Sequence, residues 1–246
     1  TPYNLQLVDE VRRFVGAHLG ELRSPAIEAY YRVVQLLTNV EPDADFQALK
    51  HLLAVQGPAL PPEDRTDVFQ YAINFCNIQI LQVREAYVQE AFQLYVNGLE
   101  SGVLLSNGQL SPWHFKNVCK LALRLQQYTW TERFIAEYTP QLAPEFQSDA
   151  LHYNLAELYY YTGRPSESMQ HLNQVEFSDV HYSLGAKVLL CKIYYEQDEP
   201  DALDSLLHAF NTYLRRNRVV GADTRKVYLN FTRLLSRVSR ALPEQY

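Results

Sequence analysis

The chain has 246 residues, 47% of them hydrophobic, so it is long enough to bury a core of its own. Its formal net charge of −6 argues against general nucleic-acid binding, and no apolar run approaches the roughly 20 residues of a transmembrane helix. The three cysteines lie far apart and form no CxxC pair, which argues against a zinc knuckle and against a disulfide framework. Free thiols fit a reducing compartment, so we expect a cytoplasmic location.

Apolar residues recur at three- and four-residue steps along nearly the whole chain, and Gly and Pro fall between these segments. This pattern predicts an all-α protein of about 12 helices. Ser24 precedes Pro25, and Ser111 precedes Pro112, which places a capping hydroxyl before a proline at the first helical position. The predicted helices cover 2–19, 25–38, 43–55, 62–82, 85–105, 112–127, 130–138, 146–162, 165–176, 179–197, 200–217 and 222–241.

Two stretches are less regular, residues 57–62 and residues 102–111. The first is a candidate hinge. In the second, Asn107-Gly108 has the composition of a tight turn, but it lies between two helical patterns and the strand signal is weak.

We interpret residues 1–246 as a single α-solenoid. Its parts would be N-terminal helices at 1–56, an irregular helical hairpin at 62–110, repeats at 111–217 and a C-terminal capping helix at 221–246. Because the first residue is Thr1 and not Met, we expect a mature form or a part of a longer protein.

Three stretches repeat one another at a spacing of 34 to 35 residues. In each, a leucine is followed at once by a small residue, after four positions by a large residue, and after four more by a turn position. The residues are Leu121, Ala122, Leu125 and Thr129, then Leu155, Ala156, Tyr159 and Gly163, then Leu190, Cys191, Tyr194 and Asp198. Such a period is typical of stacked helical hairpins, which bury their apolar faces against their neighbours.

The segment from Phe115 to about Arg216 resembles three tetratricopeptide-type hairpins. The middle copy matches best, because Leu155-Ala156, Tyr159, Gly163, Ser168 and Leu172 occupy the large, small, aromatic, turn-glycine, small and second-helix positions of that motif. Small residues at positions 156 and 168 would let the two helices approach closely.

The flanking copies depart from the motif, with Phe134 and Leu203 at the small position and Asp198 at the turn glycine. The resemblance covers somewhat under half of the chain. It implies a right-handed superhelical stack of antiparallel hairpins.

Members of this family mostly bind peptides or partner helices on a concave face lined by the first helix of each hairpin. Helical phasing would place Tyr160 and Tyr195 at equivalent positions along that groove, although aromatic residues at these spacings also fill the joints between hairpins. The predicted groove residues are Lys116, Lys120, Gln127, Tyr153, Asn154, Glu157, Tyr160, Tyr161, Lys192, Tyr195 and Glu196. Capture of a C-terminal carboxylate is not expected, because Cys119, Leu123, Val188 and Leu189 occupy places that would need polar groups.

The segment from Arg215 to Arg240 holds eight basic residues and one acid, Asp223. Lys226, Arg233, Arg237 and Arg240 step by 7, 4 and 3 residues and share one face of the last helix. This face predicts a docking surface for an acidic partner, a phosphate-bearing ligand or an anionic membrane, or else a solvated capping face. We expect the apolar face beneath to contain Val227, Leu234, Leu235 and Val238.

The chain has no glycine-rich phosphate loop, no HExxH and no GxSxG motif. The pairs Asp64/Asp67 and Asp201/Asp204 lie at predicted helix starts, where acids serve as caps. We therefore expect no enzymatic activity, no metal and no cofactor. The sequence favours a non-catalytic module that binds a protein or peptide, with a self-assembling homo-oligomeric scaffold and an all-helical enzyme or small-ligand sensor as alternatives.

Overall fold

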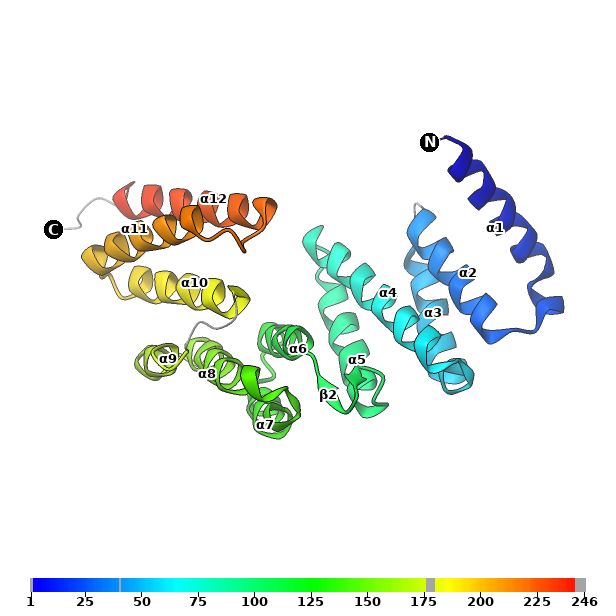
Figure 1. The fold of residues 1–246 in the computed structure, drawn as a ribbon, viewed down its shortest axis with the longest axis horizontal. Helices are drawn as coiled ribbons and strands as arrows, with labels where there is room; N and C mark the ends of the chain where they lie inside the picture. The colour runs from blue at the N-terminus through cyan, green and yellow to red at the C-terminus, as the bar shows by residue number, and fades with distance from the viewer. Residues whose placement is uncertain (1, 40, 176–179, 242–246) are drawn as a thin grey trace. The chain divides into compact units, whose positions relative to one another are not determined.

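A computed structural model describes residues 2–39, 41–175 and 180–241 (Figure 1). This part of the chain is helical apart from one two-stranded hairpin, and neighbouring helices pack in the order of the chain. The all-α prediction is therefore confirmed. The elements are α1 Pro2–Leu22, α2 Pro25–Thr38, α3 Asp43–Gln56, a 3-10 turn Gly57–Ala59, α4 Pro62–Leu81, α5 Ala86–Glu100, β1 Leu105–Ser106, β2 Gln109–Leu110, α6 Pro112–Arg124, α7 Tyr128–Tyr138, a 3-10 turn Thr139–Gln141, α8 Pro144–Tyr161, α9 Pro165–Leu172, α10 Val180–Glu196, α11 Pro200–Arg216 and α12 Ala222–Ala241.

Most predicted helix starts agree with the structure to within two residues, because they depend on local capping chemistry. The backbone N–H of Ile27 donates to Ser24 Oγ, and that of Trp113 donates to Ser111 Oγ, so both predicted serine caps are present. Among the described helices, none is both long enough and apolar enough to cross a membrane.

The largest difference from the predicted helices lies after α5, which ends at Glu100 and not at residue 105. Gly102 has a φ of 70°, a left-handed conformation that ends the helix. The chain then forms the antiparallel hairpin β1–β2, in which Asn107 and Gly108 have φ values of 52° and 76°. These are the values of a two-residue type I′ turn. Asn107-Gly108 therefore forms the tight turn that its composition favours, and the predicted helix does not continue to residue 105.

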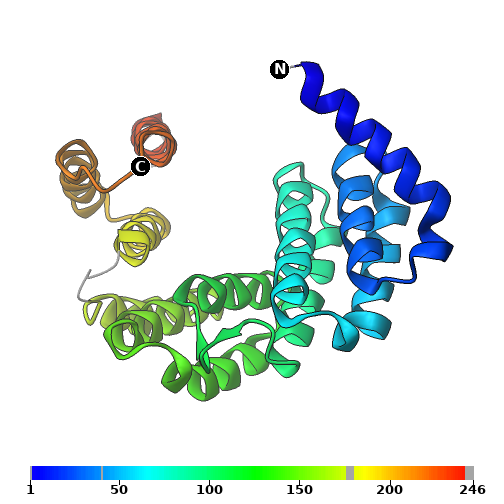
Figure 2. The same ribbon diagram turned by 45° about the vertical axis from the view of Figure 1, so that its right-hand side comes forward.

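The described chain forms two compact units, residues 1–114 with 120–125, and residues 115–119 with 126–246. In the first unit, helices α1 to α5 lie side by side (Figures 1 and 2). Its core contains three mutually packed rings, Phe46 of α3, Phe75 of α4 and Tyr87 of α5, with ring centroids 5.3–5.5 Å apart. Tyr87 also donates to Asp43 Oδ1, which joins α5 to the start of α3.

In the second unit, helices α7 to α12 pack in chain order, and α8 also contacts α10. Ala156 of α8 and Ser168 of α9 are completely buried, and Ser168 Oγ donates to the Ala156 carbonyl oxygen at 2.8 Å. These two small side chains let the backbones of α8 and α9 approach closely. Ala122 and Cys191, the small residues of the other two copies, are also completely buried.

The sequence predicts turn residues at Thr129, Gly163 and Asp198. The structure has a left-handed turn residue at the second and third of these positions but not at the first. Gly163 and Asp198 have φ values of 73° and 56°, but in the first copy the left-handed residue is Gln126, with a φ of 57°. Thr129 lies instead inside α7. Helix α6 therefore ends earlier than its counterparts α8 and α10.

The same turn geometry recurs outside the predicted repeats. After α8, Gly163 N–H donates to the Tyr160 carbonyl and Arg164 N–H to the Tyr159 carbonyl. After α4, Val83 and Arg84 donate in the same pattern to Ile80 and Gln79, and after α10 Asp198 and Glu199 do so to Tyr195 and Tyr194. The hairpin α4–α5 thus closes in the same way as α8–α9, although residues 1–110 show no clear sequence period.

Val83 is the strained member of this set of turns. Its φ is 63°, a region that β-branched residues rarely adopt, and its side chain is 77% exposed and packs little. We expect Val83→Gly to raise the free energy of unfolding by about 1 kcal/mol, since the relieved strain exceeds the entropy cost of glycine. Asp198→Gly is the matched control and should gain less, because Asp tolerates this conformation. Urea unfolding followed by circular dichroism measures both, and a loss of stability in Val83→Gly would contradict the assignment of strain.

Candidate functional site

Three of the predicted groove residues are buried. Lys116, Tyr153 and Asn154 are 7%, 1% and 0% exposed. Lys116 Nζ lies 4.4 Å from the ring centroid of Tyr153 and 5.0 Å from that of Tyr182, so its charge is held between two aromatic faces. These three side chains belong to the core of the second unit and do not form an accessible surface in this structure.

The predicted groove residues of α8 and α10 that remain accessible already have partners within the chain. Tyr160 donates to Glu196 Oε1, and Lys192 Nζ lies 5.7 Å from the Tyr160 ring centroid. Burial and this carboxylate raise the pKa of Tyr160 above its ordinary value. Glu157 accepts from the hydroxyl of Tyr153, and Tyr161 meets the Tyr160 ring edge-on at 5.5 Å. A ligand at this face would have to displace several of these contacts.

The remaining predicted groove residues occupy different settings. Tyr195 is partly buried and packs against the core cluster of Leu203, Leu207 and neighbouring residues. Lys120 and Gln127 are exposed on α6 and just before α7. Whether Tyr160 and Tyr195 form a continuous ladder for a peptide stays a prediction.

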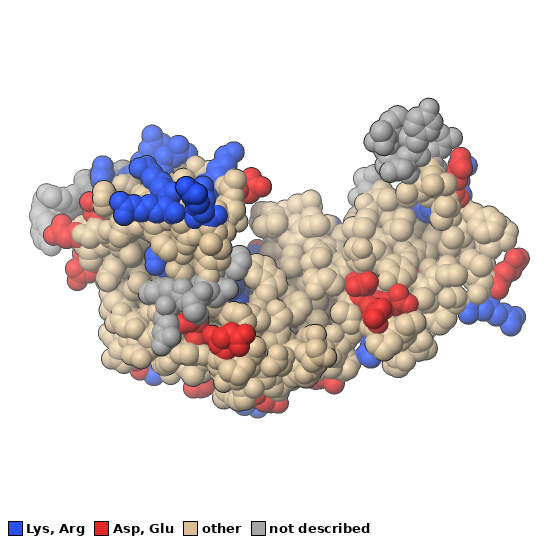
Figure 3. All heavy atoms as spheres, viewed as in Figure 1, with Lys and Arg blue, Asp and Glu red and all other residues tan. Residues whose placement is uncertain are grey.

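The basic residues of α12 form an exposed face. Lys226, Arg233, Arg237 and Arg240 are all exposed, and Lys and Arg side chains gather over α11 and α12 in Figure 3. Arg240 forms an ion pair with Asp204 at 3.2 Å, and Arg233 donates to Asn230. Whether this face docks a partner stays a prediction.

The apolar face of α12 differs from the predicted one. Val227, Leu234 and Val238 are 65%, 56% and 47% exposed, so the expectation that they lie beneath the basic face was wrong. The residues that pack against the core of the second unit are Tyr228, Leu229, Phe231 and Leu235. Helix α12 thus has a second apolar stripe, which lies in the open beside the cations.

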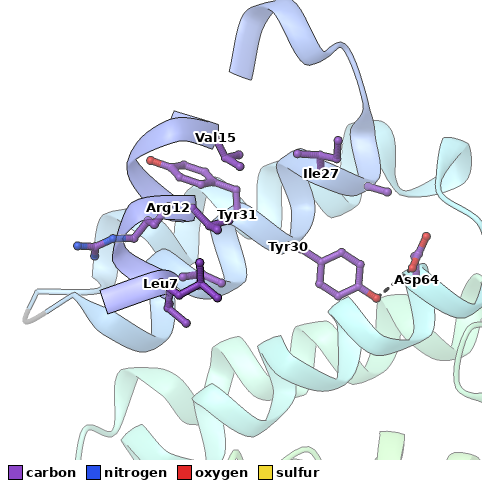
Figure 4. A pocket seen from close by; sticks show the side chains of 11 residues that line it. Leu7, Arg12, Val15, Ile27, Tyr30, Tyr31 and Asp64 are labelled. Carbon is purple, nitrogen blue, oxygen red and sulfur yellow. Dashed lines mark hydrogen bonds between the residues drawn. The ribbon is translucent and has the colours of Figure 1, made fainter. Parts of the chain in front are cut away.

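An apolar groove lies in the first unit, between α1 and α2. Four large apolar residues of α1 are strongly exposed, Leu7, Val8, Val11 and Phe14, at 45–60%. Three of them line a groove of about 640 Å³ that Figure 4 shows from close by. Its full lining is Leu7, Val8, Val11, Arg12, Val15, Ala26, Ile27, Tyr30, Tyr31, Val34 and Asp64.

Two charged residues, Arg12 and Asp64, border this groove. In Figure 4 they lie on opposite sides of the labelled group. Tyr30 donates to Asp64 at 3.0 Å and lies 3.5 Å from an oxygen of Asp67. Burial, together with the hydrogen bond to Asp64, raises the pKa of Tyr30 to about 12, so its hydroxyl stays protonated as a donor. Arg12 pairs with Asp9 at 3.2 Å.

Sequence reasoning does not find the groove. The apolar residues of α1 have the spacing of an ordinary amphipathic helix, which normally buries such a stripe. The sequence predicts a capping role for Asp64 and Asp67, and Asp64 does lie in the first turn of α4, but its carboxylate accepts from Tyr30. The apolar set Leu7, Val8, Val11 and Phe14 marks no site in the sequence, because its exposure depends on how α2 is placed.

The three cysteines are buried thiols. Burial raises the pKa of Cys76 and Cys191 to about 12, so these thiols are poor nucleophiles. Within the described ranges no three His, Cys, Asp or Glu side chains gather in a way that could hold a metal ion.

Comparisons of the chain with protein-family models, with characterised proteins and with solved structures found no match.

Proposed function

We propose that the chain is a non-catalytic interaction module, built as a right-handed TPR-like stack of helical hairpins, that binds an amphipathic helix of a partner protein. The observation that supports this most directly is the apolar groove between α1 and α2. The three cysteines are buried and form no disulfide, which is consistent with a protein that acts in the reducing cytoplasm.

The dimensions of the groove favour a helix as its occupant. The α1 residues that line it run from Leu7 to Val15, which at 1.5 Å per residue spans about 12 Å, or roughly two helical turns. Its walls are two helices that present Val11, Val34 and similar aliphatic side chains, so a third helix can pack ridges into this groove. The occupant should have an apolar stripe at positions i, i+4 and i+7.

The charged residues at the border of the groove would orient the bound helix. A Lys or Arg of the occupant would meet Asp64, and an acidic residue would meet Arg12. Because both of these protein charges are only partly buried, we expect them to determine the direction of the bound helix more than its affinity.

The face formed by α8 and α10 is the second candidate surface for the same function. Tyr161 is 43% exposed there and stands beside Tyr160, Lys192 and Glu196, which gives an extended peptide one aromatic face and charges of both signs. Its internal hydrogen bonds make it the weaker candidate.

The test uses a designed 14-residue helical peptide with leucines at i, i+4, i+7 and i+11 and lysines beside them, labelled for fluorescence anisotropy. We expect it to bind the full chain and to bind Val11→Asp at least tenfold more weakly, because a carboxylate would enter the apolar groove. The matched control is Leu81→Asp, at a residue of α4 that is 83% exposed and outside the groove lining.

A second control is a peptide of the same composition with its leucines distributed around the helix. Equal binding of the two peptides, or equal binding by the two aspartate variants, would contradict the proposed function. Circular dichroism should show the same helix content in both variants, since each replaced side chain is mostly exposed.

A further inference from the structure

We propose that the helix bound in this groove is α12 of a second copy of the chain, so that copies associate through two different surfaces. The inference rests on the proposed function of the α1–α2 groove and names its partner. It brings together two apolar features that are exposed in the described part of the chain, the groove lined by α1 and the stripe Val227, Leu234 and Val238 of α12.

The apolar stripe of α12 supplies positions i, i+7 and i+11 of the pattern expected for the occupant, while Phe231 at i+4 packs into its own unit. Val227, Leu234 and Val238 step by 7 and 4 residues, so they lie on one side of the helix and span about 16 Å. This length covers the groove between Leu7 and Val15. Since all three side chains are about half exposed or more, the stripe is available without any unfolding of α12 from α11.

The charges of the two surfaces are complementary. The cations Lys226, Arg233 and Arg237 lie about a quarter turn around the helix from the apolar stripe. On the side of the groove, Asp64 lines the hollow and Asp67 lies 3.5 Å from the Tyr30 hydroxyl, while Arg12 lines the opposite side (Figure 4) and pairs with Asp9. A helix seated by its apolar stripe would therefore hold its cations beside carboxylates.

The wider charge distribution points in the same direction. Residues 1–110 contain 13 acidic and 7 basic side chains, whereas residues 215–240 contain 8 basic and 1 acidic. The acidic N-terminal segment of one copy therefore attracts the basic C-terminal segment of another, while two basic segments repel each other. This asymmetry favours a head-to-tail contact over a symmetric one.

The packing of the helices gives the same expectation. Within each unit helices pack in chain order, so α1 is the first helix of one unit and α12 the last helix of the other, and a terminal helix in water needs a polar outer face. Helix α1 instead exposes Leu7, Val8, Val11 and Phe14, and α12 exposes its apolar stripe. Because the two surfaces differ, the contact is heterologous, and association can continue from copy to copy.

The test measures the mass of the full chain by light scattering over a range of concentrations. We expect the wild-type chain to form species that grow beyond a dimer as concentration rises, and to shrink when the salt concentration is raised tenfold. Val11→Asp, which alters the groove, and Leu234→Asp, which alters the stripe, should each be monomeric. Leu81→Asp should behave as the wild type does.

Mixing Val11→Asp with Leu234→Asp is the most specific test, because each variant lacks a different one of the two proposed surfaces. Leu234→Asp retains an intact groove, and Val11→Asp retains an intact α12, so an equimolar mixture should give one dimer of mixed composition and nothing larger. Association of either variant alone, or a mixture that stays monomeric while the wild type assembles, would overturn the proposal.

Failure of this inference and failure of the proposed function have different signatures. A wild-type chain that is monomeric throughout, but still binds the designed peptide, overturns the second copy as partner and leaves the groove as a helix site. A monomeric chain that sediments with phosphatidylglycerol vesicles, and loses this binding in Arg233→Glu/Arg237→Glu, also overturns it and assigns the α12 face to anionic lipid. Assembly that is unchanged in Val11→Asp, together with no peptide binding, overturns both.

Discussion

Replacing Ala156 by leucine should lower the free energy of unfolding by about 3 kcal/mol, because the position has no room for a larger side chain. Ala156 is completely buried on α8, and its carbonyl oxygen accepts the hydroxyl of Ser168 at 2.8 Å. Leucine would add three carbon atoms where the buried Ala156 meets Ser168 of α9, so the helices would separate and this hydrogen bond would break.

The matched control is Ala136→Leu, at an exposed position of α7. The same change of side chain there should alter stability by no more than about 0.5 kcal/mol. Urea unfolding monitored by circular dichroism would compare the two variants. Equal midpoints would show that the small residue of the repeat is not required for the packing of α8 on α9.

Much of the fold can be predicted because its signals are local. The helix α2 has the predicted bounds, since a serine cap and a first-position proline mark its start within three residues. Likewise, the repeat singles out Ala156 and Gly163, and the structure buries the first and gives the second a left-handed backbone. Such features depend on few neighbours.

The predictions that were wrong concern which side of a helix is buried, and this depends on tertiary packing. Helix α12 contains two apolar stripes, and its periodicity alone does not say which one faces α11. Phe231 and Tyr228 offer more buried area than Val227 and Val238, and the structure packs the larger pair inward. In the same way, helical phasing predicts Tyr153 in a groove, whereas the ring lies inside the second unit against Tyr182.

The candidate site shows the same limit. No spacing in the sequence reports that α1 covers α2 incompletely, because the groove is a property of two helices and their separation. The exposed stripe of α1 can be recognised as unusual only once its neighbour is placed. The polar border formed by Tyr30 and Asp64 joins residues 34 positions apart, beyond the reach of any motif.

Gly185 and Gly20 should respond to alanine with opposite signs, although both lie inside helices. A Cβ at Gly185 of α10 would lie 2.7–2.8 Å from three atoms of the Tyr153 ring and hydroxyl, closer than such contacts allow. Tyr153 is 1% exposed and donates to Glu157, so it has no space in which to move away. We expect Gly185→Ala to lower the free energy of unfolding by about 2 kcal/mol, after the better helix propensity of alanine is included.

Gly20 of α1 is exposed, and a Cβ added there would meet no atom within 4 Å. Gly20→Ala should therefore raise stability by about 0.5–1 kcal/mol through helix propensity alone. Combining Gly185→Ala with Tyr153→Leu tests the cause of the larger effect, because the second change removes the atoms in conflict. The cost of Tyr153→Leu should be smaller in the Gly185→Ala background than in the wild type, whereas strictly additive costs would mean that Tyr153 is not what limits position 185.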